Sequence, residues 1–386
     1  MDPRSQRLVL VLLLFVLTLG LYRDFGDHVR VARLTQQAAS FAVQKPLDEE
    51  SQPQSLEDVA LKPANSTLGF GSILAVSRPQ SPRRSGLLLA ANITSLDITI
   101  PPQPQWTESD ITHLRTNPNT STLTRGSALA WLGHLHALRT FLASNATTTL
   151  VIEDDIDWDI HLRTTQIPLA ASAFRSLLSN FSPPPPTPQT YWAPPTAWDI
   201  LWLGTCNDAF TATTYPHPSL SYTDATLPPP THLSPETATL LASLNVPPQT
   251  RLLHPTVSPL CTFGYALTRA AAERLLHDIA TREAPLGTAA YDVRVLEACR
   301  DLGMRCWSVA PELMRHLGGG SEIADVDSGR GGGREEEEGG RREGTANLAC
   351  GVRSSRGFRE VGEGGLEEAR RAVGEGRCLG EGERRE

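Results

Sequence analysis

The chain has 386 residues, which is enough for one large domain or two ordinary ones. Its formal net charge is −8, so it lacks the positive face that a general nucleic-acid binder needs, and we expect no nucleic-acid partner. Its six cysteines include no C-x-x-C pair, which argues against a zinc ribbon. The sequence alone does not fix which cysteines pair.

An uncharged apolar segment lies near the N-terminus. Residues 8–22 carry no charge, two arginines precede them, and Arg23 follows. This length suits a signal-peptide core or a short membrane span. No small-residue cleavage site follows, so we expect residues 1–22 to be a cytoplasmic tip and an uncleaved signal-anchor. Residues 23–66 have no sustained periodicity, and we expect them to form a stem.

We expect a folded region over residues 67–316, in which strands and helices alternate. Residues 69–78 and 95–100 have strand patterns and flank a turn followed by a short helix. Residues 124–144 carry leucines at spacings of three and four, which predicts an amphipathic helix. The β-branched strand 147–152 follows. The order of strand, helix and strand predicts an α/β fold with parallel strands.

The second half of this region continues the alternation, with two interruptions. A proline-rich stretch at 182–188 predicts a surface insertion. Residues 209–250 are rich in Thr and Pro, and we expect a long loop that is either a functional lid or an insertion. The other expected elements are a helix from 167, a strand at 197–208, a strand and a helix at 261–280, a helix at 291–303 and a strand at 304–311.

The composition changes after residue 316. Residues 317–386 are mostly Gly, Glu and Arg with few apolar side chains. Such a segment buries too little apolar surface to offset the entropy of ordering, so we expect a disordered tail.

Five N-x-S/T sequons agree with a lumenal location for the chain beyond the anchor, although each pattern also arises by chance. They begin at Asn65, Asn92, Asn119, Asn145 and Asn180. Together with the anchor, they favour a single-pass type II protein of the endoplasmic reticulum or Golgi.

A cluster of carboxylates directly follows the strand 147–152. Its members are Glu153, Asp154, Asp155, Asp157 and Asp159. Because like charges repel, water, a cation or a specific arrangement must offset the repulsion. A solvated turn is one interpretation. A calcium loop is a second, but the glycine that such a loop requires is missing.

A divalent-metal site that holds a diphosphate is the third interpretation. On an extended chain Glu153 and Asp155 point the same way, and Asp154 points the other way. Mn²⁺ or Mg²⁺ needs one or two carboxylates and fills its shell with phosphate oxygens and water. We therefore predict a metal site at Glu153 and Asp155, supplemented by Asp157, with Asp154 on the donor side. We expect Asp159 to be ordinary surface.

Several motifs in order resemble family-25 glycosyltransferases, the lipooligosaccharide-biosynthesis and procollagen galactosyltransferase family. These motifs are "ILAVSRPQSPRRSG", "GSALAWLGHLHAL", "LVIEDDI", "DILWLG" and "FGYALTRAAAERLL". The likeness spans about residues 69–316. The chain departs from the pattern at Gly133, where the family has Ser, in its proline-rich insertions, and in "APLGTAAYD", where the family has Pro-x-Asp before the last helix.

The resemblance implies a glycosyltransferase-A type fold, which is a Rossmann-like α/β/α sandwich. It implies transfer of a hexose, commonly galactose, from a UDP-sugar to a glycan or glycoprotein acceptor. It also makes His134 the histidine that lines the donor site. His136 lies two positions further along the helix and therefore faces another way.

Two further roles follow from residue chemistry. Inversion needs a general base near the acceptor hydroxyl, and Asp292 is our candidate because it opens the helix after the "FGYALTR" unit. The alternative is a carboxylate that merely favours the helix N-terminus. Arg83 and Arg84 suit bidentate contact with donor phosphates, and a solvent-exposed turn is the alternative.

The leading expectation is thus a membrane-anchored glycosyltransferase that uses Mn²⁺ or Mg²⁺. The competing expectation is a non-enzymatic lumenal or cell-surface interaction protein on a degenerate glycosyltransferase fold. The position of the acids after a buried-type strand argues against the second.

Overall fold

The computed structural model describes residues 62–179, 191–208, 210–318, 322–328 and 344–379. The expected anchor at 1–22, nearly all of the expected stem, the insertion at 182–188 and Asn180 lie outside the described residues. Among the helices of the described ranges, none has the length and hydrophobicity of a membrane span.

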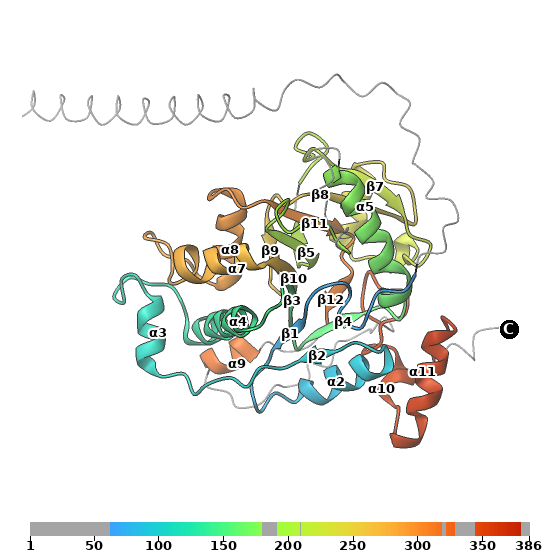
Figure 1. Cartoon of the computed structure of the whole chain (residues 1–386), viewed down its shortest axis with the longest axis horizontal. Helices are drawn as coiled ribbons and strands as arrows, with labels where there is room; N and C mark the ends of the chain where they lie inside the picture. Colours follow the sequence, from blue (N-terminus) through green and yellow to red (C-terminus); the bar gives the residue numbers. More distant parts are fainter. Residues whose placement is uncertain (1–61, 180–190, 209, 319–321, 329–343, 380–386) are drawn as a thin grey trace, which may run out of the picture. The chain divides into compact units, whose positions relative to one another are not determined.

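A mixed eight-stranded sheet forms the centre of the fold, in the order β2-β1-β3-β10-β5-β11-β8-β7 (Figure 1). Only β10 and β8 run against the direction of the other strands of this described sheet. The strands are β1 (Ile73–Val76), β2 (Ile98–Thr99), β3 (Thr148–Glu153), β5 (Ile200–Gly204), β7 (Leu220–Thr223), β8 (Thr250–Pro255), β10 (Gly264–Thr268) and β11 (Cys306–Ala310). The prediction of an α/β fold is confirmed, and the sheet is compatible with a Rossmann-like fold.

Helices cover both faces of the sheet because its strands are apolar on both faces. In β1, Ile73 and Ala75 join one core cluster and Leu74 joins the other. The first cluster packs the sheet against α2 (Arg83–Ile93) and α5 (Ile167–Ser179). The second packs it against α4 (Arg125–Ala143), α7 (Arg269–Arg274) and α8 (Tyr291–Arg300). Runs that are buried on both faces are typical of strands in α/β sheets.

Local signals set the helix boundaries that position the site. The side chain of Thr124 accepts a hydrogen bond from the backbone N–H of Ser127 and so caps the N-terminus of α4. The helix therefore begins at Arg125, one residue after the expected start at 124. Thr268 caps α7 in the same way through Ala271. The apolar stripe of α4 is buried, as its leucine spacing predicts.

The remaining elements are short. They are α3 (Glu108–Leu114), β4 (Ile156–Trp158), η1 (Leu162–Gln166), β6 (Asn207–Asp208), η2 (Pro230–His232), α6 (Pro235–Ser243), β9 (Pro259–Leu260), η3 (Leu275–Ile279), β12 (Met314–His316), α9 (Glu322–Ser328), α10 (Arg356–Arg359), η4 (Glu363–Gly365) and α11 (Leu366–Gly374). β4 pairs antiparallel with β12, and β6 pairs antiparallel with β9.

The expectation of a long loop at 209–250 is wrong in part, because this segment carries β7, η2 and α6. β7 extends the sheet by pairing with β8. Beside this pair the buried Arg251 donates to Asp224, with 2.6 Å between Nε and Oδ2. The Thr- and Pro-rich sequence conceals this edge because its stabilising contacts come from outside the segment.

The expectation of a disordered tail at 317–386 is wrong for residues 322–328 and 344–379. α10 and α11 pack on the first core cluster, and the Cys350–Cys378 disulfide closes this segment. The disulfide lowers the entropy of the unfolded chain, which composition does not reveal. In residues 344–379 the buried apolar side chains are Leu348, Cys350, Val352, Phe358, Ala369, Ala372 and Val373, and the buried polar ones are Thr345 and Asn347.

Two further disulfides join Cys206 to Cys261 and Cys299 to Cys306, so the six cysteines of the chain are all paired.

Candidate functional site

The acidic cluster begins at the carboxyl end of β3, which lies between β1 and β10 in the sheet. The chain then turns at Asp154 and Asp155 and enters β4. In open α/β sheets, ligands bind at this edge.

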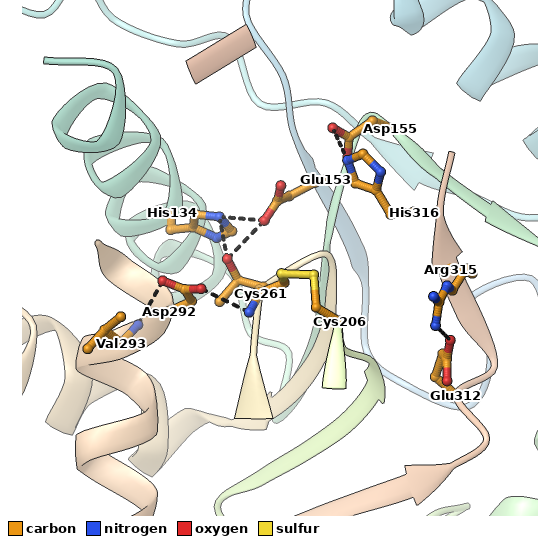
Figure 2. The surroundings of a disulfide bond; sticks show 11 residues. His134, Glu153, Asp155, Cys206, Cys261, Asp292, Val293, Glu312, Arg315 and His316 are labelled. Carbon is orange, nitrogen blue, oxygen red and sulfur yellow. Dashed lines mark hydrogen bonds and ion pairs between the residues drawn. A yellow bond between two sulfur atoms is a disulfide. The ribbon is translucent and has the colours of Figure 1, made fainter. Parts of the chain in front are cut away.

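Glu153 is held by a buried network (Figure 2). Its Oε1 accepts a hydrogen bond from Thr262 Oγ1 at 2.9 Å and lies 3.3 Å from His134 Nε2. His134 is 2% exposed, its Nδ1 lies 3.2 Å from the hydroxyl of Tyr265, and its ring stacks on Tyr291. The Glu153 side chain is itself 29% exposed. One edge of this carboxylate is therefore fixed from behind, and solvent reaches the rest. The predicted association of His134 with the acids is present.

Asp155 lies between two basic side chains. Its Oδ2 is 3.2 Å from Arg83 Nη1 and 3.1 Å from His316 Nε2, which comes from β12. Its Oδ1 is buried and has no hydrogen-bond partner among the residues that the structure describes. Burial pushes the pKa of Asp155 upward, but His316 and Arg83 outweigh that effect and leave the pKa below its usual value. The hydrogen bond to Asp155 in turn raises the pKa of His316.

Asp154 shares a neighbour with Asp155. Its Oδ2 accepts a hydrogen bond from Ser77 at 2.5 Å, and its Oδ1 lies 3.9 Å from Arg83. Burial raises the pKa of Asp154. Glu153 instead contacts His134 of α4 and Thr262, which lies in the connection between β9 and β10. The expected alternation of Glu153 and Asp155 against Asp154 is wrong, because the chain turns here and is not extended.

Asp157 does not join Glu153 and Asp155. It is fully buried, and both of its oxygens accept hydrogen bonds from the C-terminal segment or from its own strand. Burial raises its pKa. Its donors are the backbone N–H groups of Trp158, Arg353 and Ser354 and the hydroxyls of Thr345 and Ser354.

Asp159 is also fully buried, so the expectation that it is ordinary surface is wrong. Its Oδ2 accepts from the Cys350 N–H at 2.8 Å, and its Oδ1 accepts from the His161 N–H at 2.9 Å. Burial raises its pKa. Both acids of the second half of the cluster therefore hold backbone amides in place.

Asp292 contacts Cys261, the residue that precedes Thr262 of the Glu153 network (Figure 2). Its Oδ2 accepts a hydrogen bond from the Cys261 N–H at 2.9 Å, and its Oδ1 accepts from Val293 at 2.8 Å. Cys261 is bonded to Cys206, and the next residue, Thr262, contacts Glu153. Asp292 thus helps to fix the turn that presents Thr262.

Arg84 and His136, the other two residues considered for the site, contact groups outside the acidic cluster. Arg84 Nη1 donates to the carbonyl of Pro79, within its own turn. The ring of His136 meets Trp106 edge-on at 6.1 Å, and so faces away from His134, as the helical spacing predicts.

The site fits a divalent cation that takes few protein ligands. In the part of the chain that the structure describes, no three His, Cys, Asp or Glu side chains converge as a metal-binding group. Mg²⁺ and Mn²⁺ nevertheless need only one or two carboxylates when phosphate oxygens complete the shell. The buried Oδ1 of Asp155, for which the described residues supply no hydrogen-bond partner, is the candidate for such a ligand atom. Asp157 is not, because its oxygens are occupied.

Sequence reasoning missed several polar groups that come from distant segments. Thr262 is marked only by its position after a cysteine, and His316 and Ser77 carry no local signal. Gln103 follows β2, and both of its amide atoms are buried without a hydrogen-bond partner.

Packing explains why position 133 is Gly, where the resembled pattern has Ser. A Cβ at this position would lie 2.9 Å from Val76 Cγ1 and 3.8 Å from Gln103 Nε2. We therefore expect Gly133→Ser to lower the free energy of unfolding by about 1–3 kcal/mol, measured in urea. Gly374→Ser is the matched control, because nothing lies near its Cβ position and we expect little change. Equal unfolding midpoints for the two variants would contradict the packing argument.

Comparison with known proteins does not place the chain in a family, since no protein-family model matches it and no curated protein is significantly similar to it.

Proposed function

We propose that the protein is a metal-dependent glycosyltransferase that moves a hexose from a UDP-sugar to a glycan or glycoprotein acceptor. The observation that carries the proposal is Asp155, at the carboxyl end of an α/β sheet strand: its Oδ2 lies beside Arg83 and His316, and its buried Oδ1 has no hydrogen-bond partner among the described residues. The motif resemblance supports galactose as the hexose and a glycosyltransferase-A type sandwich as the finer description of the fold.

The chain's own residues have separable tasks in this proposal. Asp155 would hold Mn²⁺ or Mg²⁺, which when bound would neutralise the charge of the departing diphosphate. Arg83 would donate to phosphate oxygens, as Arg does well in bidentate pairs, and His316 would add a second donor. Asp154 keeps the turn fixed through Ser77.

In this proposal Glu153 and Asp292 act on the acceptor side, and for Glu153 this replaces the metal-ligand role that the sequence predicts. Asp292 stays the proposed general base, since each of its oxygens accepts one backbone hydrogen bond and retains a further lone pair. Glu153 would meet the sugar or the acceptor hydroxyl with its exposed edge while His134 and Thr262 hold its Oε1.

Two observations support a secretory location. Three disulfides indicate an oxidising compartment. The four sequon asparagines within the described ranges, at positions 65, 92, 119 and 145, are exposed. The membrane anchor and the type II orientation in the Golgi or endoplasmic reticulum are part of the same proposal.

The test is a screen of UDP-hexoses against the purified lumenal region with Mn²⁺ present. We expect at least one UDP-sugar to raise the melting temperature and to be hydrolysed slowly in the absence of an acceptor. If no UDP-sugar protects the protein from heat or is turned over, the proposal is wrong.

One observation favours the second candidate, a non-enzymatic interaction protein on the same fold. Asp155 Oδ2 already lies 3.2 Å from the Arg83 guanidinium, which offsets its charge without a metal ion, and 3.1 Å from His316 Nε2. The same screen separates the two candidates, because the second predicts no turnover of any donor.

A further inference from the structure

The C-terminal segment runs alongside the acidic turn. The Val352 N–H donates to the carbonyl of Trp158 at 2.9 Å, and the Ile160 N–H donates to the carbonyl of Cys350 at 3.1 Å. Asp159 and Gly351 form an antiparallel bridge. Residues 350–352 therefore act as a short additional strand along the chain that leaves the acidic turn.

Arg353 extends from this strand beneath the acidic turn. Its Nη1 donates to the carbonyls of Asp154, at 2.7 Å, and Ile156, at 2.6 Å. Its Nη2 donates to the carbonyl of Arg83, at 3.1 Å. One guanidinium group thus ties both sides of the Asp155 backbone to the first residue of α2.

These three bonds join the two halves of the proposed diphosphate site. The buried Oδ1 of Asp155 has no hydrogen-bond partner among the described residues, and Arg83 Nη1 lies 3.2 Å from the other oxygen, Oδ2. The planar fork of an arginine suits contact with several carbonyls in fixed directions. Binding sites need their groups held within about 0.5 Å of the productive geometry by a supporting shell.

We propose that Arg353 is a positioning residue for the diphosphate site, because it fixes Asp155 relative to Arg83. This inference rests on the proposed function. It also gives the buried Asp157 a task, since Asp157 accepts the backbone N–H of Arg353 at 2.8 Å and holds Ser354 by two bonds. The site is thereby completed by a segment that lies almost two hundred residues further along the chain, and Figure 1 shows its helices α10 and α11 beside α2.

The charge of Arg353 has a second effect. Burial lowers its pKa, and Asp157, Asp154 and Asp155 oppose that shift. The guanidinium therefore lies within the field of three carboxylates and offsets part of their repulsion.

The test compares Arg353→Ala, Arg353→Lys and the control Arg359→Ala, whose arginine is exposed on α10. UDP affinity is measured by calorimetric titration with Mn²⁺, at a temperature where circular dichroism shows every variant to be folded. We expect Arg353→Ala to weaken UDP binding by roughly 10- to 100-fold, as loss of a supporting contact does at a metal site. We expect Arg359→Ala to bind as the unchanged protein does.

Chemical rescue separates positioning from a general loss of structure. Millimolar guanidinium should restore UDP binding to Arg353→Ala by refilling the vacated site, and it should have no such effect on Arg359→Ala. Arg353→Lys, which keeps the charge but not the fork, should bind UDP with intermediate affinity and keeps the test valid if the alanine variant does not fold.

The outcomes are distinguishable. Unchanged UDP affinity in Arg353→Ala and Arg353→Lys would overturn this inference and leave the proposed function standing. Absence of UDP binding in the unchanged protein would overturn the proposed function, and this inference with it. Weakened binding that guanidinium does not restore would assign Arg353 to general folding and would also overturn positioning.

Discussion

Asp155→Asn is expected to weaken Mn²⁺-dependent UDP binding by at least about 100-fold. The substitution keeps the shape of the side chain but removes the negative charge that, in the proposed function, would hold a cation between the protein and the diphosphate. It also leaves Arg83 and His316 without their shared carboxylate. Calorimetric titration of UDP, with and without Mn²⁺, measures the effect.

Asp97→Asn is the matched control for this prediction, because Asp97 is exposed and lies just before β2. It should bind UDP as the unchanged protein does. If Asp155→Asn retains full Mn²⁺-dependent affinity, Asp155 does not hold the metal, even where the glycosyltransferase proposal is otherwise right.

Asp157→Ala is expected to have its main effect on folding and to lower the free energy of unfolding by roughly 3–5 kcal/mol. The change removes the acceptor of the buried Trp158 N–H and of the partly buried Arg353 and Ser354 N–H groups. For a domain of this size the melting temperature should fall by about 10 °C. Thermal unfolding followed by circular dichroism measures the shift, and Asp97→Ala, with little change expected, is the control.

This variant separates the two roles that have been considered for Asp157. The contacts described above make it a structural anchor of the C-terminal segment, whereas the sequence pattern made it a metal ligand. A variant with unchanged melting temperature and lost Mn²⁺ affinity would support the ligand role and contradict the structural one.

The repulsion between the carboxylates of the acidic cluster is offset by neighbouring groups from several parts of the fold. Glu153 meets a histidine and a threonine, and Asp155 meets Arg83 and His316. Asp157 and Asp159 accept backbone N–H groups, and Arg353 lies beneath the turn. The run of charge in the sequence therefore divides into two groups. Glu153, Asp154 and Asp155 form the candidate ligand site, whereas Asp157 and Asp159 hold backbone N–H groups in place.

Local periodicity predicted the strands β1, β2, β3, β5, β10 and β11 and the covering helices, but not β7 and β8. The leucine spacing of α4, the capping threonines and the apolar run of β3 each depend on neighbours within a few residues. The position of the acids at a strand end follows from the same local pattern, whereas their role as a metal and donor site stays a prediction.

The composition of the site could not be predicted in the same way, because it depends on contacts between distant residues. Asp157 and Arg353 are far apart in the chain, and Arg353 stands in a Gly-, Glu- and Arg-rich stretch that conceals its order. The buried side chains of α11 are Ala369, Ala372 and Val373, so few apolar residues mark this helix in the sequence. The partners of Asp155 likewise come from α2 and β12.

The central claim is that this site binds a nucleotide diphosphate through a divalent cation. Titration of UDP into the purified protein, once with Mn²⁺ and once with a chelator, tests this claim most directly. We predict binding in Mn²⁺ that becomes at least about tenfold weaker in the chelator, because the cation carries the diphosphate charge. Equal affinity under both conditions, or no binding under either, would contradict the account.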